Sequence, residues 1–293
     1  MLVLLPVVTA VSPPHLIMAL ADDLGWNNIG WRNPELATPA LDALRASGVE
    51  LERMYTFKYC SPSRSSLLSG RLPLHVTQNN KNNDVTNPGG ADLRMTLLPQ
   101  KLKAAGFATA IVGKWHVGAR STANLPMSRG FDTHLGFLKG GEDHWTQGSN
   151  DDGHRCVDLW RDSAPARGEN GTFSTFMYAK EAIRVIEQHA ARADAAPLFL
   201  YLAWHAVHTP LEAPSRFDAS VPNDDSAGTR AKVRRPCPGI SRNLSESPSA
   251  ALSSAHDATA LRGPPCTDER AGARARRGCG QCNGSASSDG HVE

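Results

Sequence analysis

Short apolar runs and segments with helical spacing alternate along the first 217 residues of the chain. Three runs are continuously apolar and of strand length: His15–Ala21, Phe107–Val112 and Pro197–Ala203. Such runs are typical of strands that are buried on both faces of a parallel sheet. Because segments with helical signals separate them, the pattern predicts an α/β fold.

Helix signals lie between the predicted strands. Thr38, followed by proline, opens the first helix, and Gly48 closes it. Leu41 and Leu44 are predicted to mark its buried side. Residues 97–105 repeat this arrangement, with a glycine after the last turn. A longer helix is capped by a serine and carries apolar residues at helical spacing, which are predicted to face the core: Ser174 as the cap, then Phe176, Ala179, Ile183, Ile186 and Ala190.

The alternating pattern ends near Phe217. Beyond it the chain has no aromatic residue and only seven Leu, Ile, Val or Met among its last 76 residues. Such a segment cannot bury enough apolar surface to offset its conformational entropy, so we expect Asp218–Glu293 to be disordered. Its composition, rich in Arg, Pro, Ser and Gly, indicates a segment that is read out of frame or mis-spliced. A genuine linker or tail is the alternative. Residues 14–217 are therefore predicted to form the folded domain.

Composition excludes some function classes. The net charge is +2, and the ten basic residues of the tail nearly balance its nine acidic ones, so a nucleic-acid partner is not indicated. The apolar run at residues 1–13 is too short to span a membrane and lacks the basic start of a signal peptide, so we interpret it as a clipped signal segment. Cys279 and Cys282 have zinc-ribbon spacing, but no second matching pair lies nearby.

Polar side chains follow each of the three predicted strands. The carboxyl ends of parallel strands meet at one edge of a sheet, where ligands bind, so these groups are predicted to converge. Solvated loop ends are the alternative interpretation. The groups are Asp22 and Asp23 after the first strand, Lys114 and His116 after the second, and His205 and His208 after the third.

These residue types suit the binding and transfer of an anion. The adjacent carboxylates of Asp22 and Asp23 can hold a hard divalent cation, Ca²⁺ or Mg²⁺, although such a pair also caps helices. Lys114 needs a partner if it is buried, and an anion supplies one. His116 and His208 are candidates for acid–base work near neutral pH, while a single histidine is more often structural.

Cys60 opens the segment Cys60-Ser61-Pro62-Ser63-Arg64. Ser61 is predicted to be an N-cap, so residue 60 would precede a helix N-terminus, where backbone N–H groups and the helix dipole favour an anion. Leu67 and Leu68 can face a core. A buried or disulfide-bonded cysteine beside an ordinary helix start, with Arg64 in a surface salt bridge, is the alternative.

Residues 14–214 resemble the N-terminal part of type I sulfatases, most closely the arylsulfatase B group. The resemblance implies an alkaline-phosphatase-like fold, a large mixed sheet flanked by helices with the active site at the strand ends. Short segments that occur in the same order as in the family carry the resemblance: Ala21–Asn27, Thr38–Leu44, the Cys60 motif, Val112–Gly118, Arg129–Asp132, and Pro197–Ala203 running into Val207–Leu211.

The resemblance also implies roles for the site residues. Cys60 would be converted to formylglycine by the formylglycine-generating enzyme, and Asp22, Asp23 and residue 60 would bind one Ca²⁺. Arg64, Lys114, His116 and His208 would surround the sulfate: His208 or Lys114 would protonate the leaving alcohol, and His116 would then remove a proton to release sulfate. The implied substrates are aryl or carbohydrate sulfate esters, including glycosaminoglycans, and the implied location is the lysosome or the extracellular space.

The chain also departs from the family pattern. The Asp-Asn pair that completes the calcium shell in the family, and a later lysine that grips the sulfate, have no counterpart before residue 217; Asp224, Asp225 and Asp289 are not preceded by an apolar strand. We therefore expect a truncated domain with an exposed sheet edge. A catalytically inactive fragment is the alternative function, and a phosphatase or phosphonate hydrolase of the same superfamily is disfavoured by Cys60. Cys156 stands in a region where the family usually has a local disulfide, but no second cysteine lies within reach in the patterned part.

Overall fold

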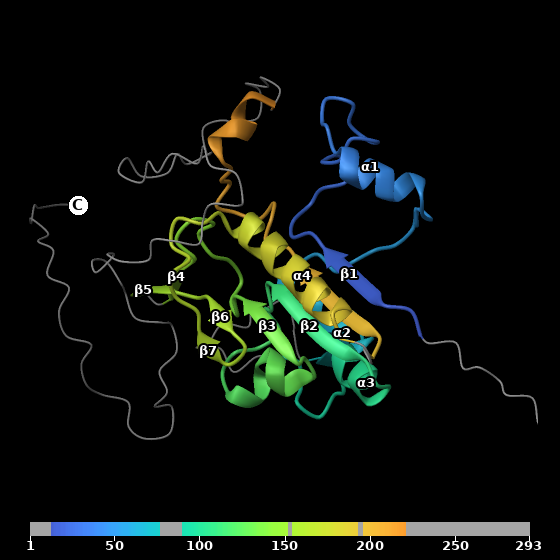
Figure 1. Cartoon of the computed structure of the whole chain (residues 1–293), viewed down its shortest axis with the longest axis vertical. Helices are drawn as coiled ribbons and strands as arrows, with labels where there is room; N and C mark the ends of the chain where they lie inside the picture. The colour runs from blue at the N-terminus through green and yellow to red at the C-terminus, as the bar shows by residue number, and fades with distance from the viewer. Residues whose placement is uncertain (1–12, 77–89, 152–153, 193–195, 221–293) are drawn as a thin grey trace, which may run out of the picture.

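The carboxyl ends of four parallel strands lie along one edge of the central sheet (Figure 1). The computed structural model describes residues 13–76, 90–151, 154–192 and 196–220. In the order of the sheet, the strands are β1 (Leu16–Leu20), β8 (Leu198–Ala203), β2 (Ala108–Gly113), β3 (Thr133–Gly136), and then the antiparallel β6 (Trp160–Arg161) and β7 (Ala164–Pro165). The predicted mixed α/β sheet is confirmed.

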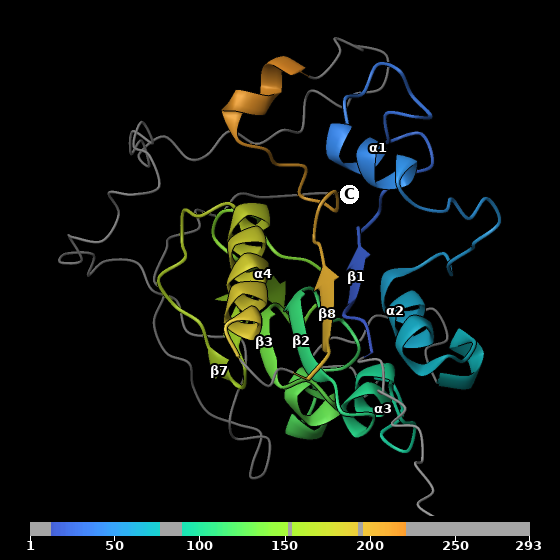
Figure 2. The ribbon, with the colours of Figure 1, turned by 45° about the vertical axis from the view of Figure 1, so that its right-hand side comes forward.

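Helices cover both faces of this sheet. Helix α4 (Ser174–Ala190) packs on β2, β3 and β8, whereas α2 (Cys60–Ser69) and α3 (Leu98–Ala104) lie on the other side (Figure 2). Alternate residues of β8 serve the two cores, because side chains of a strand point to opposite faces. Phe199 and Tyr201 join the core with Leu68 of α2, and Leu198 and Leu200 join the core with Met177 of α4.

The remaining elements extend this framework. Helix α1 (Pro39–Ala46) starts at the predicted N-cap Thr38, with proline in its first turn. Cys156 is disulfide-bonded and Cys60 is free. No helix among the described residues is long and apolar enough to cross a membrane. The other elements are the hairpin β4 (Gly148–Asp151) and β5 (His154–Val157) and the 3-10 turns Pro73–Val76, Thr122–Asn124, Pro126–Arg129 and Ser215–Ser220.

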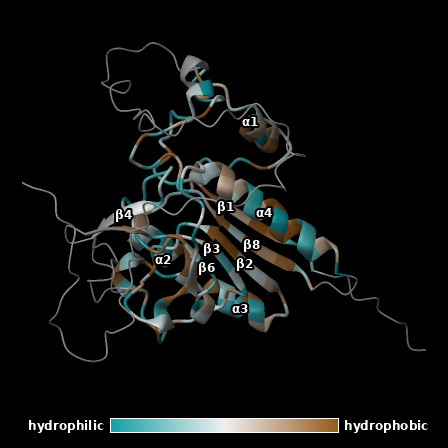
Figure 3. Cartoon of the chain, turned by 60° about the vertical axis from the view of Figure 1, so that its left-hand side comes forward, coloured by the Kyte–Doolittle hydropathy of each residue, from teal (hydrophilic) through white to brown (hydrophobic). Residues whose placement is uncertain are grey.

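Two predicted core faces are wrong. In α1 no residue is buried, and Leu44 is 67% exposed. In α4 the predicted face is turned outward, with Ile183 55% exposed. The buried face of α4 contains polar residues that have partners: Tyr178 donates a hydrogen bond to Glu142 and Glu181 pairs with Arg161. Hydropathy alone therefore selected the wrong side of the helix; Figure 3 shows apolar residues on α4 and α1 as well as on the strands.

Strand β1 also differs from its prediction. It was expected to be buried on both faces, but it forms the edge of the described sheet, with only β8 beside it. Leu16 and Ile17 are exposed, Ile17 to 58%. Within the described residues, β1 therefore presents an open edge with apolar side chains. The predictions for residues 1–12, and for the tail from residue 221 onward, lie outside the described residues.

Candidate functional site

The ends of β1, β8 and β2 are tied together by backbone hydrogen bonds. Lys114 N–H donates to the carbonyl of Ala203 at 2.8 Å. Asp22 and the loop after β8 bond reciprocally, Asp22 N–H to Ala206 O at 3.0 Å and Val207 N–H to Asp22 O at 2.8 Å. The convergence predicted from the three strand ends is therefore confirmed.

Cys60 reaches the same place from α2. The helix begins at Cys60 with Tyr59 as N-cap, so the predicted N-cap at Ser61 is wrong. The segment before the helix is fastened by Ser63, whose N–H donates to Tyr59 O at 3.0 Å and whose hydroxyl donates to Phe57 O at 2.7 Å. Leu68 is buried against the core, as predicted. Cys60 thus lies in the first turn of α2, beside the carboxylates that follow β1.

Asp22 is the centre of a buried ion-pair cluster. Its Oδ2 lies 2.5 Å from Nζ of Lys114, and its Oδ1 lies 3.2 Å from Nη2 of Arg64. Arg64 also donates to the carbonyl of Lys114 at 3.1 Å and to the hydroxyl of Tyr201 at 3.4 Å. With Arg64 only 1% exposed, the alternative of a surface salt bridge is excluded. Burial and the neighbouring Arg64 lower the pKa of Lys114, and Asp22 opposes this.

A cavity of about 520 Å³ lies in front of this cluster. Its lining includes Cys60, Asp23, His116 and His208, whereas Asp22, Arg64 and Lys114 are not among the lining residues. The sequence-predicted residues are therefore divided into a lining set and an ion-paired set behind it. The lining residues are Asp23, Lys58, Tyr59, Cys60, His116, Lys139, Gly140, Gly141, Ser149 and His208.

His116 is held in the wall of the cavity without hydrogen bonds to its ring. It is 1% exposed, and neither ring nitrogen has a hydrogen-bond partner among the described residues. Burial, followed by the charge of Lys114, holds the pKa of His116 well below its usual value, so the imidazole is neutral. Both His116 (φ 50°) and Asp23 (φ 55°) have left-handed backbone conformations, which are costly for non-glycine residues and concentrate at functional sites.

His208 faces Asp23 across the cavity. Its Nε2 lies 3.6 Å from Oδ2 of Asp23, and its Nδ1 donates to the carbonyl of Thr209 at 2.6 Å. His144 supports it from behind, with Nε2 donating to the carbonyl of His208 at 3.3 Å. His205, which was predicted to converge with these groups but was given no catalytic role, stacks on His144 with ring centroids 4.2 Å apart. The backbone carbonyl contact to Nδ1 leaves Nε2 of His208 to exchange a proton with a ligand.

Strand β3 also contributes to the cavity, which the sequence pattern did not predict. This fourth strand end delivers Lys139, Gly140 and Gly141 to the cavity. A Cβ at Gly140 would lie 2.9 Å from Cε1 of His116, so the absence of a side chain there lets the backbone approach the imidazole. The sequence did contain a signal for this strand end, because the apolar residues Phe137 and Leu138 are followed directly by Lys-Gly-Gly. Strand β3 itself contains polar residues such as His134, which concealed it.

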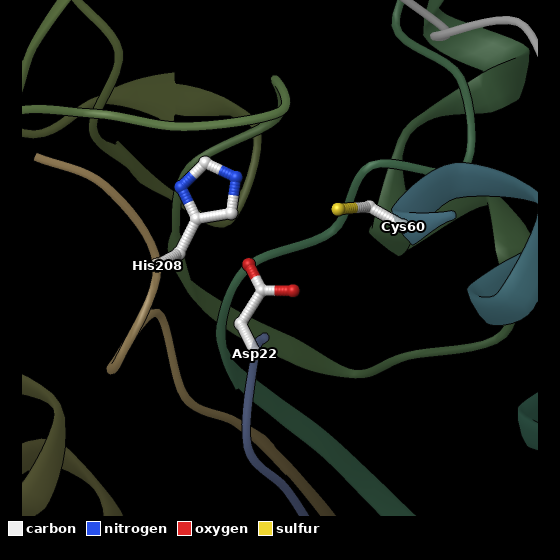
Figure 4. A group of neighbouring side chains, drawn as sticks. All are labelled: Asp22, Cys60 and His208. Atoms are coloured by element: carbon white, nitrogen blue, oxygen red, sulfur yellow. The ribbon is translucent and has the colours of Figure 1, made fainter. Parts of the chain in front are cut away.

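Three side chains present metal-ligand atoms to a shared space. Single ligand atoms of Asp22, Cys60 and His208 all lie within 4.8 Å of one another. Figure 4 shows the three side chains around a shared space, from the segment after β1, from α2 and from the loop after β8. The site thus combines a possible cation position, a helix-terminal cysteine and two histidines within one cavity.

Comparison with known families identifies the class of protein. The model of the Sulfatase family matches residues 14–261, which extends past Phe217 into the segment predicted to be disordered. The chain belongs to the sulfatase family. This family member is 41% identical over 208 residues to arylsulfatase J of Mus musculus, a match that covers 70% of this chain and 34% of that protein. It is 34% identical over 260 residues to N-acetylgalactosamine-6-sulfatase of Mus musculus, a match that covers 80% of this chain and 49% of that protein.

Solved structures show the same fold. The crystal structure of Ps i-CgsB superposes with a TM-score of 0.66 at 27% identity, over 75% of this sulfatase chain and 51% of that one. The putative sulfatase yidJ from Bacteroides fragilis gives a TM-score of 0.55 at 22% identity, over 70% of this chain and 46% of that one. The alkaline-phosphatase-like fold is therefore confirmed. The chain spans between about a third and a half of the length of these relatives and structures.

Proposed function

We propose that the chain is a sulfuric ester hydrolase whose nucleophile is made from Cys60. The observation that carries this proposal is the position of Cys60 in the first turn of α2, lining one cavity with His116 and His208 while the Asp22 ion-pair cluster lies behind it. Backbone N–H groups at a helix N-terminus and buried cations both stabilise negative charge, as a sulfate ester requires.

The thiol of Cys60 is a poor nucleophile as it stands. Burial raises the pKa of this thiol above its ordinary value, so it is protonated at neutral pH. Conversion to formylglycine by the formylglycine-generating enzyme would supply a hydrated aldehyde, with one hydroxyl to attack sulfur and a second to let sulfate leave. The frame Cys60-Ser61-Pro62-Ser63-Arg64 supports such a conversion.

Calcium is the proposed metal of the modified protein. The carboxylates of Asp22 and Asp23 suit a hard cation, and an oxygen on the modified residue 60 would add a third ligand of the same kind. The ion would supply positive charge to the sulfate oxygens. The thiol and imidazole donors of the unmodified chain do not suit calcium, so the fit depends on the modification.

The remaining site residues have two kinds of role: some position the carboxylate of Asp22, and the others transfer protons. Lys114 and Arg64 fix the carboxylate of Asp22 and place two positive charges behind the cavity. His208 lines the cavity, whereas Lys114 is enclosed and bonded to Asp22, so His208 is the better donor of a proton to the leaving alcohol. Neutral His116 then accepts the proton whose loss releases sulfate.

The proposed substrates are sulfated carbohydrates, including glycosaminoglycans, together with aryl sulfates. The name of N-acetylgalactosamine-6-sulfatase refers to a sulfated sugar, and a structure of Ps i-CgsB, at 26% identity and a TM-score of 0.66, is in complex with k-i-k-neocarrahexaose. A cavity of about 520 Å³ has room for a sugar unit and its sulfate. We place the protein in the lysosome or the extracellular space, in line with this substrate class.

A second candidate function is a sulfatase-derived binding module that does not catalyse. It is favoured by the short supply of metal ligands, because Asp23 is the only acidic residue that lines the cavity among the described residues. The two candidates differ in the chemistry of residue 60.

Co-expression with the formylglycine-generating enzyme tests the proposal. Trypsin cleaves after Lys58 and after Arg64, so it releases Tyr59–Arg64 as one peptide. Mass spectrometry should show the thiol of residue 60 replaced by an aldehyde. An unmodified cysteine under these conditions, while a known sulfatase expressed in parallel is converted, would contradict the proposal.

A further inference from the structure

The unmodified site contains donor atoms of three elements. A sulfur from Cys60, a ring nitrogen from His208 and a carboxylate oxygen from Asp22 lie within 4.8 Å of one another (Figure 4). A second carboxylate adjoins them, since Asp23 has Oδ1 at 3.9 Å from Sγ of Cys60 and Oδ2 at 3.6 Å from Nε2 of His208. The chain as encoded therefore assembles a mixed sulfur, nitrogen and oxygen set.

This donor set matches a thiophilic cation better than a hard one. Zn²⁺ is bound tetrahedrally by Cys, His and carboxylate ligands, whereas Ca²⁺ takes oxygen ligands. Bond lengths of about 2.0–2.3 Å in a tetrahedral zinc site set the ligand atoms roughly 3.3–3.8 Å apart. The contacts of Asp23 to Cys60 and His208 are already close to that spacing. Approach by about 1 Å would complete the site with Asp22, whose ligand atom lies within 4.8 Å of the others.

The surroundings tolerate the added charge. Lys114 and Arg64 each bond one oxygen of Asp22, but a carboxylate has about four lone-pair sites and can bind a metal as well. Thiolate formation at Cys60 offsets one of the two charges that the ion brings. His116 independently indicates that this cavity binds a ligand. It lines the same cavity, is 1% exposed and has no hydrogen-bond partner for either ring nitrogen among the described residues.

We propose that the unmodified chain binds Zn²⁺ between Asp22, Asp23, Cys60 and His208, and that the bound ion shields the sulfur of Cys60 from chemical attack. The site belongs to the chain before residue 60 is converted, and formylglycine, which has no sulfur, removes it. The proposal needs no sulfatase activity, so it can fail while the proposed hydrolase stands, and the reverse.

Alkylation of Cys60 tests this directly. The full chain is expressed without the formylglycine-generating enzyme, and iodoacetamide labelling of the peptide Tyr59–Arg64 is followed by mass spectrometry with and without stoichiometric Zn²⁺. Zinc should slow the labelling of Cys60 by tenfold or more, on the order of what a stable metal–thiolate bond gives. Calcium at the same concentration should not slow it, because Ca²⁺ does not bind thiolate.

Variants separate this site from other zinc-binding groups. His208→Gln should lose most of the protection, since even the loss of a ligand's outer partner weakens metal sites by about 10–100-fold. His75→Gln, an exposed histidine outside the site, should keep it. The double variant Cys279→Ser/Cys282→Ser should also keep it, which separates the site from the tail cysteines. Labelling at equal rates with and without zinc, or protection that His208→Gln leaves intact, would overturn the proposal.

Discussion

The ammonium of Lys114 lies 2.5 Å from Oδ2 of Asp22, and neither group is open to solvent. This contact joins the end of β2 to the end of β1 across the strand that separates them, β8. Arg64 of α2 completes the cluster from the other oxygen of Asp22. The position of the helix that carries Cys60 is therefore linked electrostatically to the sheet.

Loss of the Lys114 cation should be costly. Lys114→Met leaves the buried carboxylate of Asp22 with Arg64 alone, and removing one partner of a buried ion pair typically costs about 3–5 kcal/mol of unfolding free energy. Because Arg64 remains, we expect about 3 kcal/mol in denaturant unfolding.

The control is an ion pair of equal length at the surface. Lys103 and Asp132 are also 2.5 Å apart, but their side chains are 51% and 41% exposed. Lys103→Met should cost at most about 1 kcal/mol, because solvent screens such pairs. Equal losses in the two variants would mean that burial does not set the strength of the Lys114–Asp22 contact.

Gly140→Ala should impair catalysis through His116. The added Cβ would lie 2.9 Å from Cε1 of the imidazole, too close for normal contact, and no hydrogen bond among the described residues holds the ring in place. A displacement of about 1 Å can cost roughly 10²-fold in rate, so we expect a fall in kcat of that order on an aryl sulfate.

Gly168→Ala is the matched control for this substitution. Gly168 has φ +98° and open space around its Cα, so alanine strains the backbone but touches no histidine. It should lower stability without changing kcat. Should Gly140→Ala turn over substrate as fast as the parent, packing against Gly140 would not be what orients His116.

Stability should fall on acidification because of His134. Burial lowers the pKa of His134 to about 4, whereas the unfolded chain titrates near its usual 6.5. The folded state thus favours the neutral ring, so the stability it contributes is present above pH ~6.5 and is lost as the pH falls toward about 4, by about 3 kcal/mol in total.

His134→Leu removes this titration while keeping an apolar side chain in the buried position. The difference in unfolding free energy between the parent and the variant should shrink or reverse between pH 7 and pH 4.5, measured by urea unfolding at each pH. Parallel pH dependences in the two proteins would show that the burial of His134 does not contribute to acid sensitivity.

The sequence located most of the candidate site because its residues follow strand ends. Apolar runs of strand length predicted β2 and β8 within one residue at either end, and the carboxyl ends of parallel strands share an edge. The convergence of Asp22, Lys114 and His208 could therefore be predicted without any knowledge of side-chain contacts. What the sequence did not show is that Lys114 and Arg64 bond Asp22 behind the cavity instead of lining it.

The errors have a common physical cause. Hydropathy ranks Ile183 above Tyr178 and Glu181 as a core residue, but Tyr178 and Glu181 are buried because Glu142 and Arg161 satisfy them. Such pairings join residues far apart in the sequence, so no local pattern reveals them. The short strand β3 was missed for a related reason, since its backbone is held by tertiary contacts such as the hydrogen bond from His134 N–H to Oδ1 of Asp162.

The central claim is that residue 60 provides the nucleophile of a sulfate ester hydrolase. Its most direct test is turnover of nitrocatechol sulfate by the chain co-expressed with the formylglycine-generating enzyme, compared with Cys60→Ala prepared in the same way. We predict slow turnover that depends on calcium and is absent from Cys60→Ala. It should be slow because few carboxylates face the cavity among the described residues, and one missing stabilising group can cost roughly 10²–10³ in rate. Equal rates in the two proteins, with residue 60 fully converted in the parent, would contradict the claim.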